Sequence, residues 1–489
     1  GANRTYSCHT GNALSVSHIA YQSLNLDITL KYIFKMQVFN RRNFLQTSAL
    51  AFSSIGLNMV TPSLFQRRLE AAALPKDRKM IFIFLQGGND GINTVIPRGD
   101  ADYNTVNRPS LYIPEDRAID SGNGFAQFHP ALEPMMEIYN NTKLNGQEGA
   151  GNMAVLHRVG YDGQSRSHFD SQHYWQNGIP GDTDTEEGFI YRHIDANFDL
   201  NHPGNSFVAA GLSSNQLVAL KGQNMIPNFS RTRDFTFPAG NKFLGTPPSS
   251  PASKDGKGLM GLYGLSPDKP FKPYGGLVHG AGQTLGRTMT VVQDAVSKGD
   301  YTPENDAVYP DTSMGRKLSE AAMLLKRTPA KIIGLRRGGF DTHQRQGQIN
   351  GSHANLLGEL AQGMQALHRD LQSQWEDLLV VTMTEFGRTS KENGSNGTDH
   401  AESSVMFVAG GGVEGGVYNC DETTWEENAM FSARSRYLGR RTDFRAAFGE
   451  IFQRHFGDDP AMMDQLMPGY SIAQLDNPND FKSLNFLKA

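Results

Sequence analysis

Short apolar runs alternate with amphipathic stretches along most of the chain from Lys79 onward. The runs are nearly continuous in apolar residues, many of them β-branched or aromatic. Such runs are typical of strands that are buried on both faces, as in a parallel sheet. The pattern predicts buried strands at 80–85, 153–156, 331–335, 378–383 and 405–408.

The stretches between these runs predict helices at 130–143, 315–327 and 354–375, and a further helix at 443–455. In the third of these, one stripe of the helix collects the apolar side chains of Leu356, Leu357, Leu360, Met364, Leu367 and Leu371. Strands that alternate with helices predict a layered α/β domain. The segment from about 226 to 280 is rich in Pro, Gly and Ser, which predicts an irregular insertion.

A basic segment, a weak apolar run and a small-residue site follow one another early in the chain. Arg41 and Arg42 precede the apolar run 47–60, and three alanines stand at 71–73. This order predicts a twin-arginine leader, the signal of a bacterial export route that carries folded proteins. The alternative is an ordinary amphipathic helix that carries paired arginines.

The leader divides the chain into three expected parts. Residues 1–35 form an upstream extension, 36–73 the signal region, and 74–489 a single domain. The apolar run is shorter than the roughly 20 residues that a spanning helix needs, so no transmembrane segment is expected once the leader is removed. The expected location is the periplasm or the exterior of the cell.

Charge and cysteine content exclude several classes of protein. The chain has 46 basic and 50 acidic residues and no long run of either sign, which argues against nucleic acid as a partner. Its two cysteines are Cys8 and Cys420, and only the second follows the leader. A disulfide scaffold and a cysteine zinc cluster are therefore excluded, and any metal site must use His, Asp and Glu.

Polar clusters follow the first two predicted strands, where ligand sites of open α/β sheets gather. Asp90 stands in a glycine-rich turn, and Ser165, Arg166 and Ser167 lead into a predicted helix. A helix start can bind an oxyanion or activate a hydroxyl group. The alternatives are an Asx turn at Asp90 and a simple capping box at the serines.

The later strands are followed by acidic and imidazole side chains: Asp341 and His343 after one, Glu385 and Arg388 after the next, and Asp399 and His400 just before the last. Carboxylates and imidazoles can bind zinc, manganese, magnesium or calcium. A histidine taken singly is more often structural than a ligand, but the repetition at strand ends favours a shared metal site.

The ordered set of these motifs resembles a bacterial family, domain of unknown function 1501, of the alkaline-phosphatase-like superfamily that is loosely labelled sulfatase-like. The resemblance extends over about 79–456. It implies an alkaline-phosphatase-like three-layer α/β/α sandwich with a mostly parallel central sheet and a metal-centred hydrolytic site.

Carried over to this chain, the resemblance implies a role for each motif residue. Ser165 or Ser167 would be the nucleophile, and Arg166 or Arg388 would bind the oxyanion. The implied metal ligands are Asp90, Asp341, His343, Glu385, Asp399 and His400. The chain departs from the superfamily at 385–386, where Glu-Phe replaces Asp-His, and it has no Cys-x-Pro-x-Arg segment, so sulfatase activity is not expected.

The expected function is that of an exported metal-dependent hydrolase that acts on phosphate or related esters of a small molecule or polymer. The alternative is a non-catalytic protein on a degenerate hydrolase scaffold, which would bind or assemble with a protein partner in the cell envelope. A third interpretation is a purely structural metal site.

Overall fold

The computed structural model describes residues 77–140, 151–200, 202–235 and 275–488. These residues belong to one compact unit of the chain. The expected extension 1–35 and signal region 36–73 lie outside the described residues, as does most of the expected insertion.

An eight-stranded sheet forms the centre of the described part of the chain, in the order β10-β5-β9-β8-β1-β7-β6, with β11 paired to β5. The strands are β1 (Lys79–Leu85), β5 (Met153–Gly160), β6 (Ala209–Leu212), β7 (Ile332–Arg337), β8 (Leu378–Met383), β9 (Ser404–Ala409), β10 (Gly416–Tyr418) and β11 (Thr442–Asp443). Every pairing is parallel except the two that β9 makes with β5 and β8. A small antiparallel sheet joins β2 (Val95–Pro97), β4 (Ala126–Phe128) and β3 (Ile119–Asp120).

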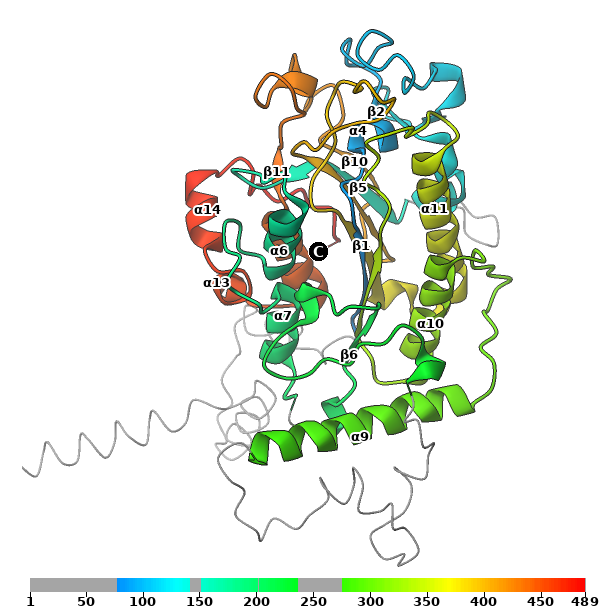
Figure 1. Ribbon diagram of the computed structural model, residues 1–489, viewed down its shortest axis with the longest axis vertical. Helices are drawn as coiled ribbons and strands as arrows, with labels where there is room; N and C mark the ends of the chain where they lie inside the picture. Colours follow the sequence, from blue (N-terminus) through cyan, green and yellow to red (C-terminus); the bar gives the residue numbers. More distant parts are fainter. Residues whose placement is uncertain (1–76, 141–150, 201, 236–274, 489) are drawn as a thin grey trace, which may run out of the picture. The chain divides into compact units, whose positions relative to one another are not determined.

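Helices cover both faces of the large sheet (Figure 1). One face carries α5 (Met136–Tyr139), α10 (Ser313–Arg327) and α11 (Ser352–Asp370). The other carries α6 (His168–Asn177), α7 (Phe189–Asn197), α12 (Phe444–Glu450), α13 (Met463–Leu466) and α14 (Tyr470–Asp476). The remaining α-helices of the described residues are α4 (Gly91–Thr94) and α9 (Gly275–Ser297). None of the described helices is both long and apolar enough to span a membrane.

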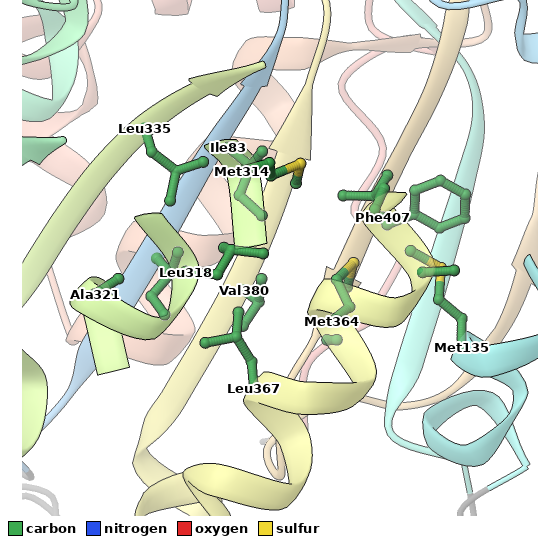
Figure 2. Packing of buried hydrophobic residues seen from close by; sticks show 14 of the residues in the cluster. Ile83, Met135, Met314, Leu318, Ala321, Leu335, Met364, Leu367, Val380 and Phe407 are labelled. Atoms are coloured by element: carbon green, nitrogen blue, oxygen red, sulfur yellow. The ribbon is translucent and has the colours of Figure 1, made fainter. Parts of the chain in front are cut away.

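The apolar strand residues divide between two cores. Ile81 and Ile83 of β1 belong to the core beneath α10 and α11, whereas Phe82 and Phe84 belong to the core beneath α6 and α7. Figure 2 shows Ile83 and its neighbours packed against Leu318 and other side chains from the helices. Burial of a strand on both faces explains why its sequence shows no polar alternation. The three-layer α/β/α sandwich with a mostly parallel sheet is therefore confirmed.

The five predicted strands are present, and the differences concern lengths and omitted elements. The segment 130–143 opens as a 3₁₀ helix, Pro130–Met135, because Pro134 cannot donate an α-helical hydrogen bond. The helix predicted at 354–375 ends at Asp370 and that at 443–455 continues from α12 as a π-helix, Ile451–Phe456. The end of the predicted insertion is wrong, because the glycine-rich residues from 275 begin α9.

The sheet direction brings four loops to one edge. Because β1, β5, β7 and β8 are mutually parallel in orientation, the loops that follow them start at the same edge. Strand β9 is antiparallel, so the residues that precede it lie at this edge too. The segments that carry Asp90, Ser165, Asp341, Glu385 and His400 therefore meet at one end of the sheet.

His157 on β5 gives the fold a specific sensitivity to acid. The side chain is fully buried, its Nε2 donates to the Val95 carbonyl at 2.9 Å, and burial lowers its pKa to about 4. In an unfolded chain a histidine has a pKa near 6.5. Between about pH 6.5 and 4 the unfolded state binds the additional proton, so stability is full above this window and falls as the pH drops through it.

We therefore expect the free energy of unfolding of the His157→Gln variant to depend less steeply on pH in this window. The difference in slope is at most about 1.4 kcal/mol per pH unit, since one proton is involved. Urea unfolding at several pH values measures it. Equal slopes for the two proteins would show that His157 takes up its proton in the folded state.

Candidate metal site

The carboxylate of Asp341 lies at the centre of three histidine side chains. Asp341 and His343 follow β7, His400 precedes β9, and His168 is the first residue of α6. The distances from Asp341 Oδ1 to the Nε2 atoms of His168, His343 and His400 are 3.3, 3.1 and 3.2 Å. Three loops from one edge of the sheet thus direct imidazole nitrogens at one carboxylate oxygen.

The second nitrogen of each ring fixes how the ring is presented. Each Nδ1 lies near an oxygen acceptor, which is Glu385 Oε1 for His168 at 2.9 Å, Asp399 Oδ1 for His343 at 3.1 Å, and the Arg166 carbonyl for His400 at 2.8 Å. An acceptor at this position holds the proton on Nδ1 and leaves the lone pair on Nε2. All three rings are therefore oriented as metal-binding histidines are.

The histidine Nε2 atoms that point toward Asp341 are arranged to interact with a cation rather than with one another. His168 Nε2 is buried and makes no hydrogen bond with the described residues, although Asp341 Oδ1 lies 3.3 Å away. The Nε2 atoms of His343 and His400 are 2.9 Å apart, although both rings direct a lone pair inward. Ligand atoms of His168, Asp341 and His400 lie within 4.8 Å of one another, so these three residues could hold a metal ion.

The charges at the site favour coordination at neutral pH. Burial alone would raise the pKa of Asp341, but the Arg388 guanidinium, 2.6 Å away, outweighs burial and lowers that pKa to about 2. Burial lowers the pKa of His400, so its ring is neutral and can bind a metal. The hydrogen bond that His168 donates to Glu385 raises the pKa of His168, so protons compete with a metal for this ring.

Glu385 and Arg388 are buried behind the metal-site residues that they contact, and neither side chain is accessible to a bound substrate or metal ion. Glu385 is fully buried and accepts hydrogen bonds from Gly87 N–H, Gln172 Nε2 and the ring of His168. The Arg388 guanidinium is also inaccessible, and it donates to Asp341 and to the carbonyls of Gly87, Gly88, Phe340 and Thr398. We therefore revise both predicted roles, because Glu385 orients a ligand and Arg388 is inaccessible, with each guanidinium nitrogen already hydrogen-bonded within the protein.

Asp90 and Asp399 also have roles other than the predicted one. Asp90 is fully buried, accepts two hydrogen bonds from Arg108, and caps α4 by accepting from Asn93 N–H at 3.4 Å. Burial opposes its ionisation, but Arg108 prevails and the pKa of Asp90 is lowered. Asp399 contacts Nδ1 of His343 and so stands behind the ring. Neither carboxylate belongs to the group of atoms around Asp341.

The two predicted nucleophiles lie just before α6. Ser167 Oγ caps the helix by accepting from Asp170 N–H at 3.4 Å, and Ser165 Oγ accepts from Ser167 N–H at 3.2 Å. Neither hydroxyl has a hydrogen bond to the histidine cluster in the part of the chain that the structure describes. The serine nucleophile stays a prediction, without a contact that supports it.

Sequence reasoning missed His168, although this residue directly follows the predicted site residues Ser165, Arg166 and Ser167. The signal was available, because His168 follows the end of β5 just as His343 follows β7. The cluster is open to solvent on one side, where the Asp341 side chain is 46% exposed and the neighbouring Phe169 is 90% exposed. Asp399 also lines a cavity of about 540 Å³, together with Lys391 and Arg436.

The comparisons with known proteins agree with part of the resemblance. A family model described as "Protein of unknown function (DUF1501)" matches residues 288–432, which is shorter than the expected 79–456. The matched segment contains Asp341, His343, Asp399 and His400, but not His168.

No curated protein matches the chain. Among solved structures it is similar to PsFucS1 sulfatase from Pseudoalteromonas sp., with 9% identity and a TM-score of 0.31 over 73% of this chain and 68% of that one. Because this similarity is low, the fold is assigned from the observed topology of the sheet and not from this match.

Proposed function

We propose that this chain is a hydrolase of phosphate or related esters that depends on a divalent metal held by His168, Asp341 and His400. The observation that carries the proposal is the convergence of Nε2 atoms whose rings are fixed through Nδ1. Two imidazoles and one carboxylate favour zinc over magnesium or calcium, which prefer all-oxygen sites.

The exposure of the site favours catalysis over a structural role. Structural zinc sites are closed by four protein ligands, whereas catalytic sites have three and keep a position open. Here three residues form the group, and the Asp341 side chain is 46% exposed. A bound divalent ion would polarise an ester oxygen and increase the acidity of water.

His343 is placed to accept a proton from the attacking water. Its Nδ1 is held by Asp399 at 3.1 Å, and its Nε2 lies 3.1 Å from Asp341 Oδ1 and 2.9 Å from His400 Nε2. The Asp399 carboxylate would stabilise the imidazolium that forms, as in other Asp–His pairs. We therefore assign His343 as the general base and Asp399 as the residue that orients it.

Arg166 is the cation that can receive a negatively charged substrate. Its carbonyl accepts from His400 Nδ1 at 2.8 Å, which places it beside the ligands. Its guanidinium lies over the Tyr437 ring at 5.1 Å, and the side chain is 35% exposed, although Nη1 itself is buried and makes no hydrogen bond with the described residues. The nearest carboxylate, that of Glu402, is 3.8 Å away. The guanidinium of a partly exposed arginine side chain can bind a phosphate-type oxyanion.

Replacement of His343 by glutamine separates a general base from a fourth metal ligand. If His343 is the base, turnover falls by about 10²–10⁴-fold while bound zinc stays at the wild-type level. Aryl phosphate, phosphodiester, sulfate and carboxylic esters provide the assay panel, and metal analysis after dialysis measures the zinc. Loss of zinc together with turnover would instead make His343 a ligand. Zinc without turnover of any ester in the wild-type protein would favour the non-catalytic envelope protein.

The variant Arg166→Met tests recognition of the substrate's charge. A hydrogen bond to a charged group contributes about 1.5–3 kcal/mol, so we expect KM for an anionic ester to rise about 10–100-fold. KM for an uncharged carboxylic ester measured on the same preparation should not change. An equal effect on both esters would contradict the assignment.

We propose a periplasmic or secreted location on the basis of the paired arginines at 41 and 42.

A further inference from the structure

Gln346 joins the two loops that carry the ligands Asp341 and His400. We infer that Gln346 is a positioning residue, which holds these loops at the separation that metal binding requires. The inference rests on the proposed function, since it concerns the geometry of the same site. According to this inference, the fully buried amide of Gln346 and the buried carboxylate of Asp90 both contribute to metal binding.

Both ends of the amide are used. Gln346 Oε1 accepts from Thr342 Oγ1 at 2.9 Å and from Thr398 Oγ1 at 2.6 Å. Thr342 stands between Asp341 and His343, and Thr398 stands two residues before His400. One oxygen atom therefore connects the two ligand-bearing loops, and the Thr398 N–H donates to the Thr342 carbonyl at 3.1 Å as a parallel link.

The other end of the amide anchors this junction to a third loop. Gln346 Nε2 donates to Asp90 Oδ2 at 2.6 Å. Arg108 binds the same carboxylate at 2.7 Å and also donates to the carbonyls of Thr389 and Ser390, at 2.8 and 3.0 Å. The Asp90–Arg108 pair therefore contacts the loop after β8 directly and the loop after β7 through Gln346.

The chemistry of the junction requires an amide. Two hydroxyl groups need an acceptor, and the carboxylate of Asp90 needs a donor; an uncharged side chain that offers both is Gln or Asn. Methionine has a similar length but neither function, so in Gln346→Met the buried hydroxyls and carboxylate each lose a partner. Of the links described here, the loops then keep the backbone hydrogen bond from Thr398 to Thr342, so the separation of the ligand atoms is less tightly held.

The test is zinc affinity of the full chain, measured by competition with a chromophoric chelator. Outer partners of metal ligands typically contribute 10–100-fold to affinity, so we expect Gln346→Met to bind zinc about 10–100-fold more weakly than wild type. Thr398→Val removes only one hydroxyl with little change of shape. We expect Thr398→Val to bind zinc more weakly than wild type as well. This variant tests the inference if Gln346→Met does not fold.

Asp370→Asn is the matched control for lost stability. Asp370 is another buried polar junction, which accepts from Tyr301, Tyr309 and Lys326 at 2.9, 2.7 and 2.8 Å. It lies at the end of α11, a helix of 19 residues and thus about 28 Å long, whose first residue follows the loop of Gln346. We expect this variant to lose stability and to keep its zinc affinity.

The outcomes separate this inference from the proposed function. Wild-type zinc affinity in Thr398→Val and in any folded Gln346→Met overturns the positioning role, and leaves the metal site intact if His400→Ala still abolishes binding. Equal weakening by Asp370→Asn overturns it too, because the effect would then follow general stability. A wild-type protein that binds no zinc overturns both the site and the role of Gln346.

Discussion

Replacement of His400 by alanine is expected to remove zinc from the protein and to reduce ester hydrolysis to background. His400 supplies one of the three ligand atoms, and the ring is held in place by the Arg166 carbonyl. Loss of a direct ligand should exceed the roughly 10–100-fold that the loss of an outer partner costs. Metal content after dialysis, and hydrolysis of the ester panel, measure the two effects.

His173→Ala is the control for this experiment. His173 lies on α6, as His168 does, but its Nε2 contacts the Thr185 carbonyl at 2.8 Å. The variant should keep its zinc and its turnover, whereas His168→Ala should behave like His400→Ala. A His400→Ala protein that retains one zinc ion and normal turnover would contradict the assignment of the ligands.

The variant Arg108→Met is expected to lower the free energy of unfolding by about 3–5 kcal/mol, because it leaves a buried carboxylate without its charge partner. Arg108 and Asp90 are both inaccessible, and their side chains are joined at 2.7 and 3.2 Å. Urea unfolding at pH 7 measures the loss. Lys298→Met, which removes an exposed pair with Asp294 at 3.3 Å, should cost no more than about 0.5 kcal/mol.

The loss in Arg108→Met should shrink as the pH is lowered. In the wild-type protein the pKa of Asp90 is lowered, so the stability that this carboxylate contributes is present above its unfolded pKa, near 3.9, and is lost as the pH falls through the folded value. Without Arg108, burial raises the pKa of Asp90, and the carboxyl group takes up a proton as the pH falls. A deficit that is constant from pH 7 to pH 4 would contradict the ionic origin of the effect.

The layers of the fold could be predicted because burial on both faces leaves a direct mark on the sequence. All of β8, Leu378–Met383, is apolar or threonine, and the prediction matches its bounds. Strand β6, Ala209–Leu212, is not predicted from the sequence, because its four residues are mostly alanine and glycine and do not form a run of large apolar side chains. The reversed direction of β9 could not be predicted, since pairing depends on distant segments.

The site could be located from the sequence, but the roles within it could not. Residues at the ends of strands meet at one edge of a parallel sheet, which is why Asp341 and His400 were found. A carboxylate in a glycine-rich turn has the same local sequence whether it faces a ligand or an arginine. The sequence therefore predicts a ligand at Asp90, because its partner Arg108 is identified only by the fold.

X-ray diffraction from crystals of the zinc-loaded protein, with anomalous data at the zinc edge, tests the ligand assignment most directly. We expect one anomalous peak per chain, about 2.0–2.2 Å from Nε2 of His168, Nε2 of His400 and a carboxylate oxygen of Asp341. A peak bound by Asp90 or Glu385, or zinc-loaded crystals without a peak beside Asp341, would contradict the account.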